Sequence, residues 1–203
     1  MTLQLNFFDD ERDGLALEHL EGFRYLPELI TPADDGALLA EVRELPFHDF
    51  EFHGFTGKRR VVSFGWQYDY SGGKIRKAAE IPEFLLPLRA LAASFAHLEP
   101  HDLQQALVTE YQPGTGIGWH RDKAVFGRVV GISLLSACVL RFRRKMSDES
   151  MRGRSKPWER VNVSTEPRSA YLLSGPARWE WEHSILRVDG LRYAITFREV
   201  RDR

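Results

Sequence analysis

The chain has 203 residues, of which 43% are hydrophobic and 28% are charged. That composition can supply the buried core of one compact domain, and it excludes an intrinsically disordered chain. Because the formal net charge is only −1 at pH 7, a generally basic nucleic-acid-binding surface is excluded too, and contact with nucleic acid would need a local patch. We therefore expect a single domain over residues 1–203.

The cysteine content and the N-terminal residues indicate in which cellular compartment the protein is expected. The single cysteine, Cys138, lies in an apolar run and cannot form an internal disulfide. Residues 1–10 lack the basic start and long apolar stretch of a signal peptide, and no run approaches the ~20 apolar residues of a membrane span. We expect a cytoplasmic monomer with no membrane contact.

Two helices are predicted in the first half of the chain. Thr31 is a suitable N-cap, Pro32 fits the first turn, and apolar residues continue at helical spacing until Pro46. A second helix is expected over residues 81–96, where leucine, alanine and phenylalanine recur at the same spacing.

Between these helices, a basic cluster precedes a row of aromatic residues. The two groups are Lys58, Arg59 and Arg60, then Phe64, Trp66, Tyr68 and Tyr70. Cations for phosphates and rings for bases would suit a single-stranded or flipped nucleotide. The same alternation also describes a strand that faces a core. A second candidate patch is residues 141–160, with eight basic and three acidic side chains.

From residue 106 onward the sequence reads as short strands separated by glycine and proline. We predict strands over residues 106–111, 119–122, 129–135, 138–144, 160–164, 169–173, 179–184 and 191–199. Eight strands suffice for a double-sheet jelly roll, which can bind ligands between its sheets. The predicted fold is α+β: a double-stranded β-helix (jelly roll) in residues 106–199, with helical support and a substrate lid in residues 1–105. Residues 147–157 are the expected mobile loop at the rim of the site.

The triplet His120-Arg121-Asp122 is the first candidate for metal binding. It follows a turn rich in proline and glycine that would lead into a short strand. Positions i and i+2 of a strand share a face, so His120 and Asp122 would point together and Arg121 away. The alternative is an exposed loop whose side chains meet only solvent.

His183 is the second candidate. Residues 178–183 alternate strictly, which would place His183 on one buried face with Trp179 and Trp181. Two imidazoles and one carboxylate can hold a non-haem Fe(II) while leaving other coordination positions open. The alternative is a buried histidine that is hydrogen-bonded to a backbone carbonyl.

Residues 192–198 predict a strand with two different faces. Tyr193, Ile195 and Phe197 form an apolar face, and the opposite face carries Arg192, Ala194, Thr196 and Arg198. Guanidinium groups beside small residues could bind the carboxylates of a small dianion. The strand over residues 106–111 would add the hydroxyl groups of Thr109 and Tyr111 to that cavity. An ordinary solvated face is the alternative.

Together, these motifs resemble the AlkB family of Fe(II)- and 2-oxoglutarate-dependent dioxygenases. The shared features are Tyr-x-Pro-Gly before His-x-Asp, a distal histidine, and Arg-Tyr-x-x-Thr-Phe-Arg, all between Tyr111 and Arg198. The resemblance implies that iron is bound by His120, Asp122 and His183, with no catalytic residue beyond these ligands. It also implies a 2-oxoglutarate site made by Arg192, Arg198, Tyr111 and Thr109.

Residues 59–71 match the family's nucleotide-recognition lid more loosely. The match assigns substrate contacts to Trp66, Tyr68, Tyr70, Arg59 and Arg60. The chain also departs from the founding bacterial enzyme, because Thr109 and Ala194 stand where that enzyme has asparagines, and Ala124 replaces an acidic residue that contacts the damaged base.

The implied activity is oxidative N-dealkylation of alkylated nucleobases in DNA or RNA, with Fe(II), 2-oxoglutarate and O2. The alkyl carbon leaves as formaldehyde, and 2-oxoglutarate becomes succinate. Ala124 keeps open the same chemistry on a protein side chain, a modified tRNA or a small metabolite. A non-enzymatic jelly roll with a structural ion is the other alternative, although the sequence offers no fourth protein ligand of suitable spacing.

Overall fold

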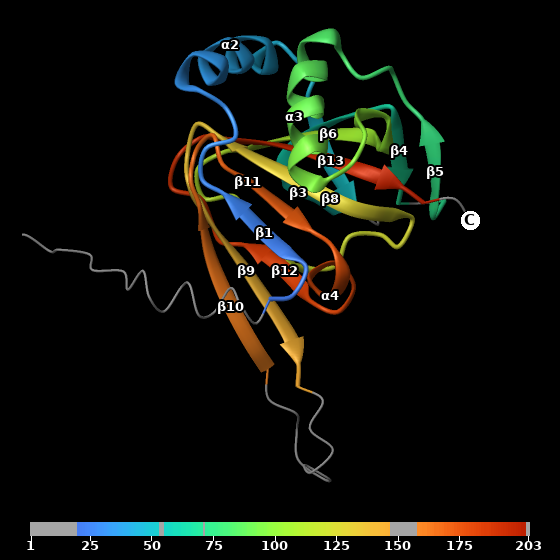
Figure 1. Cartoon of the computed structure of the whole chain (residues 1–203), viewed down its shortest axis with the longest axis vertical. Coiled ribbons are helices and arrows are strands. Elements are labelled where there is room, and N and C mark those ends of the chain that lie inside the picture. The colour runs from blue at the N-terminus through green and yellow to red at the C-terminus, as the bar shows by residue number, and fades with distance from the viewer. Residues whose placement is uncertain (1–19, 53–54, 71, 147–157, 202–203) are drawn as a thin grey trace, which may run out of the picture.

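The computed structural model describes residues 20–52, 55–70, 72–146 and 158–201 (Figure 1). Our expectation of a mobile loop at residues 147–157 falls outside these ranges. No helix among the described residues has both the length and the apolar character needed to cross a membrane.

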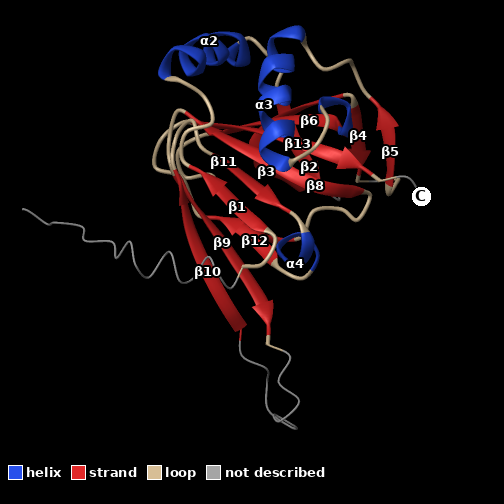
Figure 2. Cartoon of the chain, viewed as in Figure 1, coloured by secondary structure: helices blue, strands red, loops and turns tan. Residues whose placement is uncertain are grey.

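Two antiparallel sheets form the jelly roll (Figure 2). The larger sheet has seven strands in the order β1 (Phe23–Leu26), β11 (Ala170–Leu173), β8 (Phe126–Leu134), β13 (Arg192–Val200), β6 (Leu103–Tyr111), β3 (Phe55–Phe64) and β2 (His48–Phe52). The smaller sheet has four, in the order β10 (Trp158–Thr165), β9 (Cys138–Lys145), β12 (Glu182–Ile185) and β7 (Ile117–His120). A separate hairpin pairs β4 (Trp66–Asp69) with β5 (Lys74–Lys77).

The helices lie mainly on one side of the larger sheet (Figure 1). They are α2 (Pro32–Arg43), α3 (Leu86–Ala96) and α4 (Gly175–Trp179), with short 3-10 turns η1 (Glu83–Leu85) and η2 (Pro100–Asp102). Thr31 caps α2 as predicted, because its hydroxyl accepts a hydrogen bond from the Asp34 backbone N–H. The expected helix over residues 81–96 is shorter, since its first turn is the 3-10 segment.

Two hydrophobic cores follow from this layering. One core packs α2 and α3 against the larger sheet and includes Tyr193, Ile195 and Phe197. The other lies between the two sheets and includes Ala194 and Phe142. The alternation of β13 therefore separates a helix-facing side from a side that faces the interior of the roll. The predicted α+β jelly roll with supporting N-terminal helices is confirmed.

Two strand predictions need correction. The strand expected over residues 119–122 ends at His120, so Asp122 stands in the loop that follows. Residues 178 and 179 belong to α4, and Trp179 is exposed while Trp181 is fully buried, so the alternating pattern was wrong there. The proline-led turn Gly175–Trp179 explains the error, because a helix start overrides period-two spacing.

The aromatic row of residues 64–70 is also not one strand. Phe64 ends β3 in the helix-side core, and Gly65 breaks the chain with φ +71° before β4 begins at Trp66. A side chain at Gly65 would collide with the Gln104 carbonyl oxygen, 2.1 Å from the added carbon. Phe64 and Trp66 therefore belong to different sheets. The strands β1 to β5 all lie before residue 106, where the sequence analysis predicted no strand.

Candidate metal centre and co-substrate pocket

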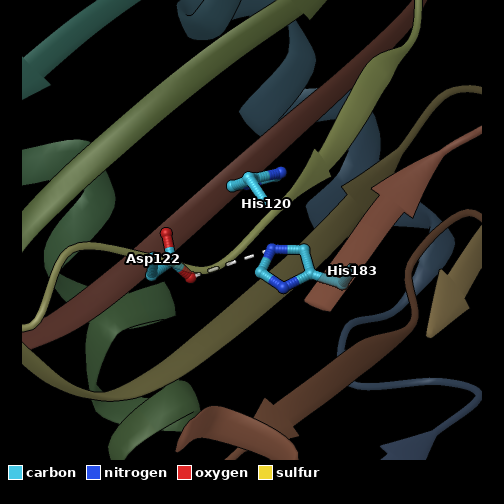
Figure 3. Close-up of side chains that lie close together, drawn as sticks. All are labelled: His120, Asp122 and His183. Carbon is cyan, nitrogen blue, oxygen red and sulfur yellow. Dashed lines mark ion pairs between the residues drawn. The ribbon is translucent and has the colours of Figure 1, made fainter. Parts of the chain in front are cut away.

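The structure brings His120, Asp122 and His183 together from segments about sixty residues apart (Figure 3). His120 ends β7 and lies directly opposite His183 on β12 in the sheet register. The candidate ligand atoms of the three residues all lie within 4.8 Å of one another. Strand pairing thus positions the two imidazoles, and the loop after β7 brings the carboxylate to them.

Hydrogen bonds orient two of these side chains. The Nδ1 of His120 lies 2.9 Å from the Gly118 carbonyl oxygen, and since a carbonyl only accepts, Nδ1 carries the proton and Nε2 is left as the lone-pair nitrogen. Arg198 donates from Nη2 to Oδ1 of Asp122 at 3.1 Å. The other carboxylate oxygen, Oδ2, lies 3.9 Å from Nε2 of His183. One nitrogen of each histidine and one oxygen of Asp122 can therefore serve the same ion.

Burial and neighbouring charges hold these groups in metal-binding protonation states. Burial, with a contribution from His120, lowers the pKa of His183 from its ordinary 6.5 to about 3, so this imidazole is neutral at pH 7. Burial alone would raise the pKa of Asp122, but the neighbouring groups, led by the positive charge of Arg198, outweigh it and lower the pKa below its ordinary value. Both groups can accept a cation without first losing a proton.

Arg178 holds the loop that carries Asp122, and the sequence did not reveal this role. Its side chain is only 3% exposed. It donates to four backbone carbonyls, at 3.3 Å to Asp122, 2.8 Å to Lys123, 2.7 Å to Phe126 and 2.9 Å to Gly127. Because Arg178 stands five positions before His183, it ties the segments of both ligands together. The sequence offered no signal for this role, because the alternation of residues 178–183 put Arg178 on the face opposite to His183.

A second cluster lies deeper between the sheets. Arg192 is only 1% exposed and donates from Nε to the Ser133 hydroxyl at 3.1 Å. Its guanidinium carbon lies 5.1 Å from the centre of the Tyr111 ring, and the two residues are directly paired across β13 and β6. Its Nη1 atom is buried and has no hydrogen-bond partner among the described residues. A buried guanidinium with an unused donor is suited to an anion.

Thr109 and Tyr111 stand on the same face of β6, and Tyr111 lies beside this guanidinium. Both are buried, and Thr109 pairs directly with Ala194 on β13. Burial raises the pKa of the Tyr111 hydroxyl, although the cations Arg192 and Arg59 oppose the rise, so the phenol stays a hydrogen-bond donor. Three of the four residues predicted to bind 2-oxoglutarate, Arg192, Tyr111 and Thr109, lie in this cluster. Arg198 lies nearer the metal ligands, where it donates hydrogen bonds to Asp122 and to Gln105, both at 3.1 Å.

A group of aromatic side chains and cations lies near the candidate metal ligands. The rings of Tyr68 and Tyr70 meet edge to face with centres 4.9 Å apart, and Nζ of Lys123 lies 5.2 and 5.3 Å from those centres. Arg59 stacks on Phe50 at 3.6 Å. Burial raises the pKa of Tyr70, on which Arg198, Arg59 and Asp122 also act electrostatically. The predicted substrate residues Arg59, Tyr68 and Tyr70 therefore lie near the metal ligands.

Trp66 and Arg60 are placed differently. Trp66 lines a cavity of about 490 Å³ with Tyr68, Lys123 and Ala124, beside the loop that follows Asp122. Arg60 points to the helix side of the sheet, where Nε and Nη2 each donate at 2.8 Å to the carboxylate of Glu110. Its guanidinium therefore lies on the opposite face from Arg59, and its contact with nucleic acid stays a prediction. Consecutive residues of β3 face opposite sides of the sheet, which separates Arg59 from Arg60.

Comparison with known proteins shows which family the chain matches. The model of the 2OG-Fe(II) oxygenase superfamily matches residues 22–198. That range includes every candidate residue described above.

Individual relatives are more distant. An Arabidopsis thaliana protein named "Alkylated DNA repair protein ALKBH8 homolog" is 27% identical over 91% of this chain. A mouse "tRNA (carboxymethyluridine(34)-5-O)-methyltransferase ALKBH8" is 25% identical over 90% of the chain. The chain spans 60% of the length of the plant protein and 27% of the mouse protein.

A solved structure shares the fold. "The structure of OsALKBH1" superposes with a TM-score of 0.64 and covers 88% of this chain and 98% of its own. Sequence identity in that superposition is 16%, so the likeness is one of architecture.

Proposed function

Because the chain belongs to the 2OG-Fe(II) oxygenase superfamily and to its AlkB family, we propose that it removes N-alkyl groups from nucleobases of DNA or RNA by oxidation. The observation that carries this proposal is the cluster of His120, Asp122 and His183 beside a buried arginine with an unused donor. Two nitrogens and one oxygen are the ligand set of Fe(II) oxygenases of this kind.

The residues fit the cofactors that the family implies. We assign Fe(II) to His120, Asp122 and His183, and we assign the distal carboxylate of 2-oxoglutarate to Arg192 and Tyr111. The unpartnered Nη1 of Arg192 supports that assignment, because a carboxylate would satisfy it. When bound with O2, these cofactors supply oxidation of the carbon attached to nitrogen.

The chain's own groups then have limited tasks. Arg198 orients the Asp122 carboxylate so that Oδ2 faces His183. Thr109 and Tyr111 stand on the interior face of β6 and would position the co-substrate. Buried side chains around them keep water from the reacting carbon, and no side chain needs to transfer a proton.

Nucleic acid is the proposed substrate class because cations and aromatic rings lie together near the candidate metal ligands. We call Arg59, Lys123, Tyr68 and Tyr70 the entrance residues. Lys123 lies beside the rings of Tyr68 and Tyr70, and Arg59 stacks on Phe50, which itself contacts Tyr70. This arrangement suits a phosphate next to a stacked base. The names of the plant and mouse relatives, one for DNA repair and one for tRNA, are consistent with that class.

A substrate panel tests the proposal. Fe(II) and 2-oxoglutarate are bound anaerobically, O2 is admitted, and succinate and formaldehyde are measured with methylated and plain oligonucleotides of DNA and RNA. We expect formaldehyde from a methylated single strand and little from its plain counterpart. Tyr68→Ala should weaken binding of that strand by about 1 to 3 kcal/mol without changing the salt dependence, whereas Tyr25→Ala, a matched change on the distant strand β1, should not.

Arg59→Ala should instead lower the salt slope of binding by roughly 0.7, because it removes one cation that neutralises a phosphate. Formaldehyde release that is the same with and without the methyl group, together with binding independent of salt, would reject nucleic acid and favour a protein or metabolite substrate.

A second candidate is oxidation of a modified base in tRNA. Ala124, in the loop after Asp122, offers no carboxylate to recognise a cationic methylated base, and Lys123 beside it is positive. Turnover on tRNA that carries a modified uridine, without turnover on methylated DNA, would favour this candidate.

A further inference from the structure

Strand β9 carries a row of basic side chains on the face of the smaller sheet that points away from the core between the sheets. Leu140 and Phe142 are buried in the core between the sheets. By alternation, Arg141, Arg143 and Lys145 therefore lie on the opposite, outer face. This basic row belongs to the stretch of residues 141–160 that the sequence marked as a candidate patch.

Two tryptophans connect the row. The guanidinium carbons of Arg141 and Arg143 lie 4.8 and 4.4 Å from the ring centre of Trp119. Trp158 is contacted by Arg143 at 4.3 Å and by Nζ of Lys145 at 5.5 Å. The result is a continuous ladder, here called the outer ladder, of Arg141, Trp119, Arg143, Trp158 and Lys145.

The two arginines of the outer ladder are anchored through their Nε atoms. Arg141 donates to the Ser184 hydroxyl at 3.0 Å, and Arg143 donates to a Glu182 carboxylate oxygen at 2.7 Å. These bonds and the indole contacts fix the stems and use Nε, not the terminal Nη groups. Side chains held in this way lose less conformational entropy when they bind a phosphate, which is the anion that a guanidinium fork fits.

The charge of this face is unbalanced. Arg160, exposed on β10, lies directly opposite Arg143 in the sheet register. Like charges in that position destabilise a sheet. Among the described residues of this outer face, four cations (Arg141, Arg143, Lys145 and Arg160) stand against the single carboxylate of Glu182. An anionic partner would relieve the repulsion between the opposed arginines.

The position of the outer ladder connects it with the candidate site. Strand β7 is the edge of the smaller sheet. Its consecutive residues Trp119 and His120 face opposite sides, so the ladder begins one residue from a candidate metal ligand. Alternate residues of β9 are ~6.8 Å apart along the strand, a spacing comparable to that of successive phosphates in an extended single strand. A strand that leaves the site over the edge of β7 would meet this row.

We propose that the outer ladder binds the phosphate backbone of a single-stranded nucleic acid next to the base that enters the site. This inference rests on the proposed function, since it assumes a nucleic acid substrate. The rings of Trp119 and Trp158 hold the cations, and the cations contact the phosphates. Specificity for the base stays with the entrance residues, and the outer ladder adds affinity that depends on salt.

The test measures binding of a fluorescent single-stranded RNA at several salt concentrations. The double variant Arg141→Gln, Arg143→Gln should lower the slope of log affinity against log salt by about 1.4, which is about 0.7 for each neutralised phosphate. Between about 50 and about 200 mM salt the parent should then lose roughly sevenfold more affinity than the variant. Trp158→Leu should weaken binding without changing the slope, because it removes the support and keeps the charges.

The matched control removes two cations elsewhere. Arg43→Gln, Arg89→Gln changes one residue on α2 and one on α3, which cover the larger sheet, and should leave the slope unchanged. Consumption of 2-oxoglutarate without nucleic acid should be equal in parent, variant and control. An unchanged slope in the outer-ladder variant, when the parent binds RNA, overturns this inference alone. A parent that consumes 2-oxoglutarate but binds no single strand overturns the nucleic acid substrate and this inference together.

Discussion

The two faces of strands β6 and β13 use the same backbone for different purposes. On the helix side, Tyr193, Ile195 and Phe197 pack into an apolar core under α2 and α3. On the interior side, Arg192 and Thr109 are just as buried, but they are polar. Burial alone therefore does not distinguish a core from a site.

The two faces differ in whether their buried polar groups have hydrogen-bond partners within the chain. On the helix side, the buried carboxylate of Glu110 is satisfied by Arg60, Gln112 and Tyr193. On the interior side, Nη1 of Arg192 and Nε of Arg198 are buried without a partner among the described residues. Buried polar atoms without partners cost free energy unless a ligand satisfies them. We infer that the folded chain by itself satisfies Glu110 on the helix side, whereas the two buried guanidinium groups of the interior side are left with donors that a bound anion could use.

The largest expected effect comes from the interior side. Asp122→Ala should abolish conversion of 2-oxoglutarate to succinate while the protein stays folded, because one of three candidate metal ligands is removed. Succinate formation and Mn(II) binding by calorimetry check this result, with circular dichroism as the measure of folding. Asp189→Ala, on an exposed loop, is the control. Turnover at the parent rate in Asp122→Ala would show that the metal site is elsewhere.

Arg192→Ala should weaken 2-oxoglutarate binding by about 2 kcal/mol or more, which is roughly thirtyfold, because a charge-assisted pair is deleted. Mn(II) binding should survive, since Arg192 is not a candidate ligand. Isothermal titration of the Mn(II)-loaded protein measures both. Exposed Arg187→Ala is the matched control. Equal affinity for 2-oxoglutarate in the parent and in Arg192→Ala would place the co-substrate outside this pocket. The interior face would then not differ from the helix side by binding a ligand.

The smallest effect is expected on the helix side, and it depends on pH. Hydrogen bonds from Arg60 lower the pKa of Glu110 below its ordinary value of 4.5. A lowered folded-state pKa gives stability that is present above 4.5 and is lost as the pH falls through the folded value. Glu110→Gln should therefore reduce the free energy of unfolding by about 1 to 2 kcal/mol at neutral pH, and the difference should shrink in acid.

Urea unfolding at several pH values measures this difference, with the exposed residue change Glu80→Gln as its control. Affinity for 2-oxoglutarate should stay at the parent value in Glu110→Gln. A large loss of that affinity would mean that the two faces are coupled and not separate.

Local patterns in the sequence were sufficient for much of the fold. Thr31 and Pro32 marked the start of α2, and the two-residue alternation of residues 192–198 separated the two faces of β13 correctly. Alternation failed at residues 178–181, where Gly175 and Pro176 begin a short helix. It also failed across Gly65, because the chain must pass close to the Gln104 carbonyl. In both places a local backbone requirement overrode the spacing of apolar residues.

The sequence by itself determined the family, the jelly roll and the identity of the candidate ligands, because these depend on motifs and periodicity within single segments. Only the tertiary structure decided which groups meet. It paired His120 with His183 across two strands, directed Arg60 to Glu110 and Arg59 toward the site, and placed Arg178 under the loop of Asp122. It also assembled the outer ladder from three strands. Such contacts join residues far apart in the chain, and their geometry follows from strand register and sheet packing, which no local pattern specifies.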